Sequence, residues 1–326
     1  MIDFLRTIRE YIKYWPSRVI NQHQAGNKKD IFIFSSPRSG STWLMELIEA
    51  QPNIKYIDEP FHTNRHKGYL TDIEPTWQEI YGSAERKEKF TYFLKDILNE
   101  KRFVGQQKFK HIKRGEFNYS TDRRVFKILR AKDLVNHFED DFDIKIVYLL
   151  RHPIAVALSL VRENMEGRIK YYLNNQKYRE QFLSEKLIEF SNNILQNGSQ
   201  FEIRILQWAL ENLPPLKFLD SSDWLTISYE ELVVEEEKSL NRLYQELNLT
   251  DLDVLYKQVG RPSRTTANQE AEEHINKNDK EFLIKKWEDK VSQAEIEETF
   301  NILNRFGIDI YQKGKFTINK QSEFFN

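Results

Sequence analysis

The sequence contains no cysteine and little glycine or proline, 11 and 9 of its 326 residues. The missing cysteines exclude disulfides, thiolate catalysis and cysteine-bound metal, and they are typical of a reducing compartment. The few glycines and prolines do not gather into an interdomain linker, and no repeat or low-complexity segment interrupts the chain. The seven histidines are scattered without metal-ligand spacing, so the sequence predicts no metal site.

Long hydrophobic runs and an excess of one charge are missing as well. Lysine and arginine number 49 against 50 aspartates and glutamates, a balance that does not indicate nucleic-acid binding. Residues 1–30 form an N-terminal extension without a run long enough to cross a bilayer or to act as a signal peptide. We expect a helix at Ile2–Arg9 that packs on its own domain, with docking on a membrane surface as the alternative, and a cytoplasmic location without a transmembrane segment.

Short apolar runs alternate with longer helical patterns. The runs are mostly branched or aromatic, as buried strands of a parallel sheet are, and they are Ile31–Phe34, Ile54–Ile57, Val125–Leu129, Ile144–Leu150 and Trp224–Ile227. The helical patterns are about Ser41–Ala50, Lys132–Asp140, Pro153–Asn164, Ser184–Asn212, Glu235–Leu247 and Ala294–Phe306. This alternation predicts an α/β fold with a central parallel sheet flanked by helices in three layers, as a single domain over residues 1–326.

The strongest local pattern follows the first apolar run and reads Ser35-Ser36-Pro37-Arg38-Ser39-Gly40-Ser41-Thr42-Trp43. Gly40 allows the backbone to approach an anion closely, and Ser41 and Thr42 place hydroxyl groups in the first turn of the next helix. The N–H groups and dipole of that turn attract anions, and Arg38 adds a planar cation suited to phosphate or sulfate oxygens. The loop therefore predicts an anion site.

Two classes of enzyme have such a loop. A P-loop hydrolase or kinase needs G-x-x-x-x-G-K-[ST], but a serine stands in place of the first glycine and no lysine follows Gly40. Pro37–Thr42 instead match P-[KR]-[SA]-G-[ST]-[ST] and resemble the 5′-phosphosulfate loop of sulfotransferases that use 3′-phosphoadenosine 5′-phosphosulfate (PAPS). The resemblance implies a P-loop-like fold, PAPS as co-substrate, and binding residues Pro37, Arg38, Ser39, Gly40, Ser41, Thr42 and Trp43. A P-loop phosphotransferase and a non-catalytic nucleotide-binding module remain alternatives.

A second pattern lies about 110 residues further on. Arg151 follows the run Ile144–Leu150, and Ser159 comes eight residues later on the next helix. This pair resembles the family's 3′-phosphate segment. A weaker match, Leu225–Leu232, resembles the strand-plus-Y-E-[DE]-L segment and implies that Tyr229 lies near the adenine.

Near the C-terminus, Gly260–Thr266 resembles the family's late cofactor-covering loop, and Lys286-Trp287 resembles the lysine and tryptophan that follow it. The resemblance therefore adds Lys286 to the cofactor-binding residues. In all, it covers about Ile31–Tyr311, and its two sharp motifs are the loop and the Arg151/Ser159 pair.

Sulfuryl transfer needs an in-line nucleophile and stabilisation of developing charge. The transferred group carries less charge than a terminal phosphate, so fixed cations suffice and no metal is required. Arg38 and Lys127 are the candidates, and Lys127 resembles the family lysine on the third strand.

The general base is expected to be a carboxylate. Cytosolic members of the family have a histidine two residues after that lysine, where this chain has Leu129. Glu59-Pro60 instead resembles the glutamate pattern of carbohydrate and protein-tyrosine members, so Glu59 is the predicted base. His62 is the alternative, because its ordinary pKa suits proton transfer.

The acceptor is expected to be a hydroxyl or amine of a carbohydrate or a small natural product. Two irregular insertions, residues 63–121 and 163–200, are predicted to form its pocket. They contain the aromatic residues Tyr69, Trp77, Tyr81, Tyr92, Phe93, Tyr171 and Tyr172. The sequence does not indicate an oligomeric state.

Overall fold

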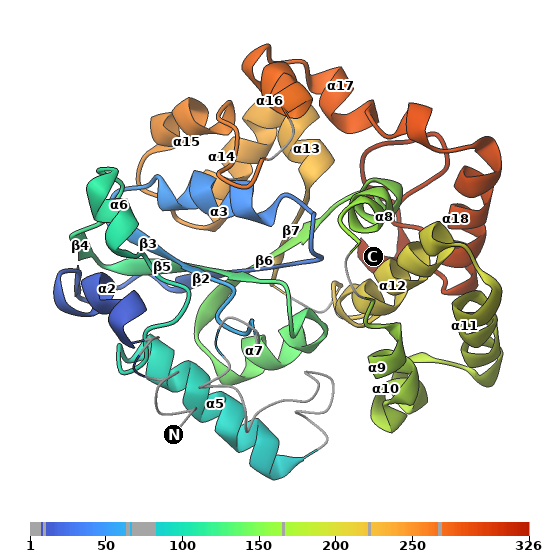
Figure 1. The fold of residues 1–326 in the computed structure, drawn as a ribbon, viewed down its shortest axis with the longest axis horizontal. Helices are drawn as coiled ribbons and strands as arrows, with labels where there is room; N and C mark the ends of the chain where they lie inside the picture. The colour runs from blue at the N-terminus through green and yellow to red at the C-terminus, as the bar shows by residue number, and fades with distance from the viewer. Residues whose placement is uncertain are drawn as a thin grey trace.

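The computed structural model describes residues 8, 11–62, 66, 83–164, 167–220, 223–266 and 269–325. Its centre is a five-stranded sheet in the order β3-β5-β2-β6-β7 (Figure 1). The strands are β2 (Asp30–Ser35), β3 (Ile54–Asp58), β5 (Arg123–Ile128), β6 (Ile144–Leu150) and β7 (Leu225–Ser228). Every neighbouring pair is parallel. The prediction of five strands in a parallel sheet is confirmed.

Helices cover both faces of the sheet, as the three-layer prediction requires (Figure 1). Successive side chains of a strand point to opposite faces, so Phe32 and Phe34 belong to one core and Ile31 and Ile33 to the other. The first core is completed by α5 (Ala84–Leu98), α7 (Val135–Asp141), α8 (Pro153–Arg162), α12 (Gln200–Leu216) and α18 (Gln293–Arg305). The second core is completed by α3 (Ser41–Glu49), α14 (Glu236–Glu246) and α15 (Leu252–Val259).

Shorter elements surround these layers. A two-stranded parallel sheet pairs β1 (Gln22–His23) with β4 (Ser120–Thr121). The remaining helices are α2 (Trp15–Val19), α6 (Phe109–Lys113), α9 (Ile169–Asn174), α10 (Gln176–Phe182), α11 (Glu185–Asn197), α13 (Tyr229–Val234), α16 (Gln269–Asn276) and α17 (Lys280–Lys285). Short 3₁₀ helices lie at Lys132–Leu134, Glu288–Lys290 and Glu323–Phe325.

The single helical pattern expected over Ser184–Asn212 is wrong, because the chain forms two helices there, α11 and α12. Gly198 ends α11 in an extended conformation. Ser199 then caps α12: its hydroxyl accepts the N–H of Glu202, and the Glu202 carboxylate accepts the N–H of Ser199. This S-x-x-E capping box is present in the sequence and explains why a new helix begins at this point.

The N-terminal extension is helical at residues 11–13 and again in α2. The helix expected at Ile2–Arg9 lies outside the described residues except for Ile8. Within the described ranges, no helix has both the length and the apolar character needed to cross a membrane.

Candidate functional site

The loop between β2 and α3 lies at the carboxyl end of the central strand. Gly40 is the N-cap of α3 and has a φ of 86°, a conformation that favours glycine. A Cβ at Gly40 would lie 2.8 Å from Cδ2 of Tyr229, so the position also has no space for a side chain. The loop is therefore packed against Tyr229, and the N–H groups in the first turn of α3 lie directly after it.

Arg38 connects the two anion-binding patterns predicted from the sequence, the loop and the Arg151/Ser159 pair. Its Nε donates a hydrogen bond of 2.9 Å to Oγ of Ser159, and its carbonyl oxygen accepts one of 2.8 Å from Nη1 of Arg151. Burial lowers the pKa of the Arg38 guanidinium, and Glu163 opposes that shift. Three predicted binding residues from three separate segments therefore meet beside the loop. The Arg38 side chain faces Ser159.

Aromatic side chains line the next part of the site. The guanidinium carbon of Arg151 lies 4.2 Å from the ring centroid of Tyr229, within the range of a cation–π contact. Tyr229 meets Trp43 edge to face, with centroids 5.7 Å apart, and Nε1 of Trp43 donates to the carbonyl of Val259. Burial raises the pKa of the Tyr229 hydroxyl. Trp43 and Tyr229, both predicted to bind the nucleotide, thus form one aromatic wall beside Arg151.

Oγ of Ser35, Oγ of Ser39 and Nε of Arg151 are buried in this region without a hydrogen-bond partner in the described part of the chain. Ser39 is only 1% exposed. Buried donors without partners are rare and cost free energy. Together with the first turn of α3, these donors fit the anionic groups of PAPS.

The predicted base and the predicted catalytic lysine lie together where β3 and β5 end side by side. Nζ of Lys127 lies 2.7 Å from Oδ1 of Asp58 and 3.4 Å from Oε1 of Glu59, and it donates to Oγ1 of Thr42 at 3.0 Å. The other oxygen of Glu59, Oε2, lies 2.7 Å from Nη1 of Arg130. Lys127 therefore links the anion loop to the carboxylate.

The backbone at Glu59 has an uncommon conformation. Its φ is 48°, in the left-handed region that non-glycine residues seldom adopt. Its N–H donates to the carbonyl of Lys127 on the neighbouring strand at 3.0 Å, and its carbonyl accepts the N–H of His62 at 3.1 Å. The Glu59 side chain is 9% exposed, so β5 and the following turn fix it at the sheet edge.

Three residues around Lys127 and Glu59 are not among the site residues predicted from the sequence. Arg130 and Asp58 both lie at or just beyond strand ends, and the rule that ligands bind at the carboxyl ends of parallel strands would have indicated them. Gly105 has no such signal. It has a φ of 67° and accepts the N–H of Asp58 at 2.8 Å, and a Cβ there would lie 2.4 Å from the Asp58 carbonyl oxygen.

Lys286 and the expected late loop lie around this site. Lys286 ends α17, a helix that packs on α13, which begins at Tyr229. The adjacent Trp287 stacks on His152 with centroids 4.5 Å apart, and burial lowers the pKa of His152 to about 3. In the loop 260–266, Arg264 pairs with Glu46 of α3 at 2.9 Å.

The two insertions are only partly described. Tyr69, Trp77 and Tyr81 lie outside the described residues. Phe93 belongs to the core that α5 forms with the sheet, and Tyr172 is buried in the same core, whereas Tyr92 and Tyr171 are exposed. The role of residues 63–121 and 163–200 in an acceptor pocket stays a prediction. The described residues contain no group of three or more His, Cys, Asp or Glu that is arranged to hold a metal ion.

The three layers and the loop between β2 and α3 define a P-loop-like α/β protein. The model of the Sulfotransferase family matches residues 30–253. The chain belongs to this family, and it is an enzyme that transfers sulfuryl groups.

Three solved structures that are similar to the chain are sulfotransferases or sulfotransferase domains. The sulfotransferase domain of the Synechococcus PCC 7002 olefin synthase has a TM-score of 0.45 and 18% identity, and the match covers 89% of this chain and 99% of that one. The sulfotransferase domain of the curacin biosynthetic pathway has a TM-score of 0.45 and 19% identity, covering 86% and 98%. Mouse sulfotransferase SULT7A1 complexed with PAP has a TM-score of 0.40 and 17% identity, covering 86% and 85%. No curated protein matches the sequence.

Proposed function

We propose that this enzyme transfers the sulfuryl group of PAPS to a hydroxyl or amine of a carbohydrate or a small natural product. The observation that supports this most is the meeting of Arg38, Ser159 and Arg151 beside the first turn of α3. Two guanidinium groups, a hydroxyl and a helix N-terminus suit a nucleotide that carries anionic groups at both its 3′ and 5′ positions.

Each part of the nucleotide has a proposed partner. Arg151 and Ser159 hold the 3′-phosphate, and Tyr229 with Trp43 packs against the base. The backbone and hydroxyls of Pro37–Thr42 hold the phosphosulfate, supported by the buried, partnerless Oγ of Ser39. Lys286, at the end of α17, contacts the nucleotide next to the Trp287 ring that stacks on His152. When bound, PAPS supplies the sulfuryl group and a phosphate leaving group.

Glu59 is the proposed general base, and Lys127 the main cation for the leaving oxygen. Lys127 suits this role because it contacts Thr42 of the loop and also Glu59. Arg130 holds the second oxygen of Glu59, which fixes the direction in which the carboxylate accepts a proton from the acceptor. Arg38 bonds Ser159, so its proposed share in stabilising the transferred group is secondary to that of Lys127.

The acceptor class is supported by the Glu59-Pro60 pattern, and the absence of cysteine supports a cytoplasmic location. A screen with sulfur-labelled PAPS against saccharides, amines and phenolic natural products tests the proposal. We expect PAP release in proportion to a labelled carbohydrate or natural product, identified by mass spectrometry. PAP binding without transfer to any acceptor of these classes would contradict the proposed acceptor.

A further inference from the structure

Apolar side chains are exposed along the N-terminal helical segment. Tyr11, Trp15 and Val19 recur at intervals of four residues, the spacing of one helix face. They and one neighbour are largely in solvent, with exposed fractions of 45% for Tyr11, 66% for Ile12, 41% for Trp15 and 58% for Val19. Tyr14, on the inner side, is only 2% exposed. The segment therefore packs by one side and presents a row of apolar side chains on the other.

Positive charge surrounds this row. Residues 11–20 and 101–115 contain eight lysines and arginines and no aspartate or glutamate, although the whole chain has nearly equal numbers of each sign. The two segments are in contact, since Oγ of Ser17 donates to the carbonyl of Gln107 at 2.8 Å and Nζ of Lys108 lies 5.6 Å from the Tyr14 ring centroid. These contacts lie beneath the row. At the surface, Tyr11 of the row lines one pocket with Arg18, Lys101 and Arg102, so the apolar row and these cations share a surface, called here the docking face.

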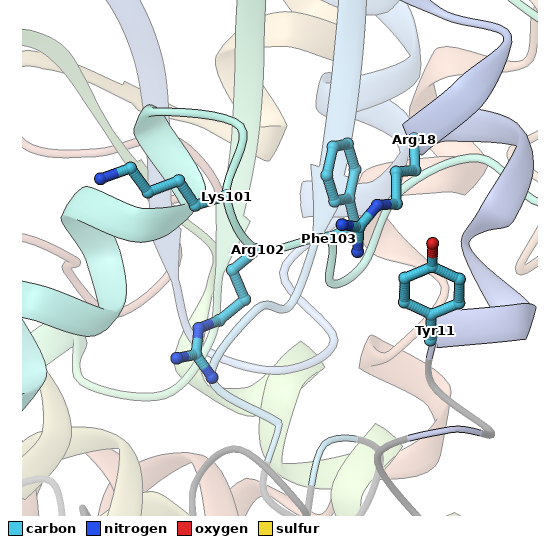
Figure 2. Close-up of a pocket in the computed structure, with 5 residues that line it drawn as sticks. All are labelled: Tyr11, Arg18, Lys101, Arg102 and Phe103. Carbon is cyan, nitrogen blue, oxygen red and sulfur yellow. The ribbon is translucent and has the colours of Figure 1, made fainter.

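A pocket of about 140 Å³ opens in the docking face, lined by Tyr11, Arg18, Lys101, Arg102 and Phe103 (Figure 2). Figure 2 shows the Arg18 guanidinium between two rings, with its carbon 4.3 Å from the Tyr11 centroid and 5.7 Å from that of Phe103. Arg102 pairs with Asp96. Among the described residues, Arg18 and Lys101 have no carboxylate partner, so their charge is available to an anion.

We propose that the docking face binds a bilayer surface that carries anionic headgroups. Lipid phosphates lie against Arg18 and Lys101, and Ile12, Trp15 and Val19 enter the interface. A helix with apolar and aromatic residues on one side and cations beside them lies in the plane of a membrane surface. Tryptophan suits the headgroup level, and nearby basic residues are attracted by anionic lipid. A nucleic acid would use the cations but leave Ile12 and Val19 in water.

The docking face lies away from the part of the enzyme site that contains Ser159. β1 follows α2 and pairs with β4, which directly precedes β5. Figure 1 shows α2 at the β3 edge of the sheet, whereas α8, which carries Ser159, lies toward the opposite edge. The proposal does not depend on the acceptor or on the identity of the base.

Sedimentation of the full chain with vesicles tests the proposal. We expect binding to vesicles of phosphatidylcholine mixed with phosphatidylglycerol, weak binding to phosphatidylcholine alone, and release of bound protein by salt. Trp15→Ser combined with Ile12→Ser, and separately Arg18→Glu combined with Lys101→Glu, should each weaken binding to anionic vesicles by about tenfold or more. The matched control is Tyr256→Ser with Lys257→Glu on α15, which should bind like the parent.

The two variants keep the test decisive if one of them unfolds, and circular dichroism melting reports which is folded. The proposal would be overturned if a folded docking-face variant bound anionic vesicles as tightly as the control does. Equal binding of the parent to neutral and anionic vesicles, or no binding to either, would also overturn it. Self-association without lipid, abolished by the same substitutions in sedimentation velocity, would identify a second copy as the occupant and also overturn it.

Discussion

Oε2 of Glu59 lies 2.7 Å from Nη1 of Arg130, at the point where β3 and β5 end side by side. The other oxygen of the same carboxylate faces Lys127, and Lys127 also donates to Thr42 in the anion loop. The proposed base is therefore held by two cations, and one of these contacts the loop proposed to bind the phosphosulfate. Base and loop are connected through a single lysine.

Replacing Glu59 with glutamine should lower turnover by roughly 10²–10⁴, the usual contribution of a positioned general base. Glutamine has nearly the shape of glutamate, so folding and PAP affinity should stay close to those of the parent. Steady-state turnover with labelled PAPS and calorimetry of PAP binding measure the two quantities. His62→Asn is the control and should have little effect. An active Glu59→Gln enzyme together with an inactive His62→Asn enzyme would make His62 the base.

Arg130→Ala should reduce turnover by about tenfold or more, because Glu59 loses the partner that fixes its Oε2. PAP affinity should change little, since Arg130 pairs with the proposed base. Arg130→Lys should restore part of the rate, because an ammonium group can hold one carboxylate oxygen but not in the geometry of a guanidinium. A variant that loses turnover only in proportion to its melting temperature would show that Arg130 has a structural role alone.

Arg151→Ala should weaken PAP binding through the 3′-phosphate. A charge-assisted contact of this kind contributes on the order of 1.5–3 kcal/mol. Affinity for adenosine 5′-phosphosulfate, which lacks the 3′-phosphate, should hardly change, and calorimetry with both nucleotides measures the difference. If the two nucleotides weaken by the same factor, Arg151 does not bind the 3′-phosphate. Arg305→Ala provides the control, because the Arg305 guanidinium packs over the Phe190 ring of α11.

Glu230 should make stability depend on pH. Burial raises the pKa of its carboxyl from 4.5 to about 7, although Arg151 and the hydrogen bonds from His152 and Tyr311 oppose the shift. The folded state therefore keeps a proton that the unfolded chain releases above pH 4.5. Its stabilising effect is complete below that pH and is lost as the pH rises to about 7.

Glu230→Gln cannot ionise and should lack this loss. The free energy of unfolding of the variant, relative to the parent, should increase by on the order of 2 kcal/mol across this interval. Urea unfolding at a series of pH values measures both proteins. Curves that stay parallel from acid to neutral pH would show that Glu230 is not protonated in the folded state.

Much of the fold could be predicted because its strands are buried on both faces. Such strands are mostly apolar runs, and all five are visible in the sequence. The boundary between α11 and α12 was missed although the capping box at Ser199 and Glu202 marks it, because the apolar helical pattern continues on both sides. Strand order is not visible, since β5 enters between β3 and β2 only through packing.

The site was predictable where a residue lies in the loop or at a strand end. Lys127 and Glu59 were chosen on separate grounds, and parallel pairing of β3 with β5 brings them together. The direction of the Arg38 side chain was not predictable, because it depends on a φ of 69° that no pattern indicates. Gly105 supports Asp58 from 47 positions away in sequence, and only the tertiary structure reveals that contact.

Thermal unfolding with PAP and with ATP tests the central claim, a site built for PAPS, most directly. The enzyme should be stabilised by PAP in the presence of EDTA, by about 1.4 kcal/mol when free PAP is tenfold above its dissociation constant. ATP with magnesium should stabilise it much less, because the loop has no lysine after Gly40. Equal stabilisation by ATP that requires magnesium would contradict the account.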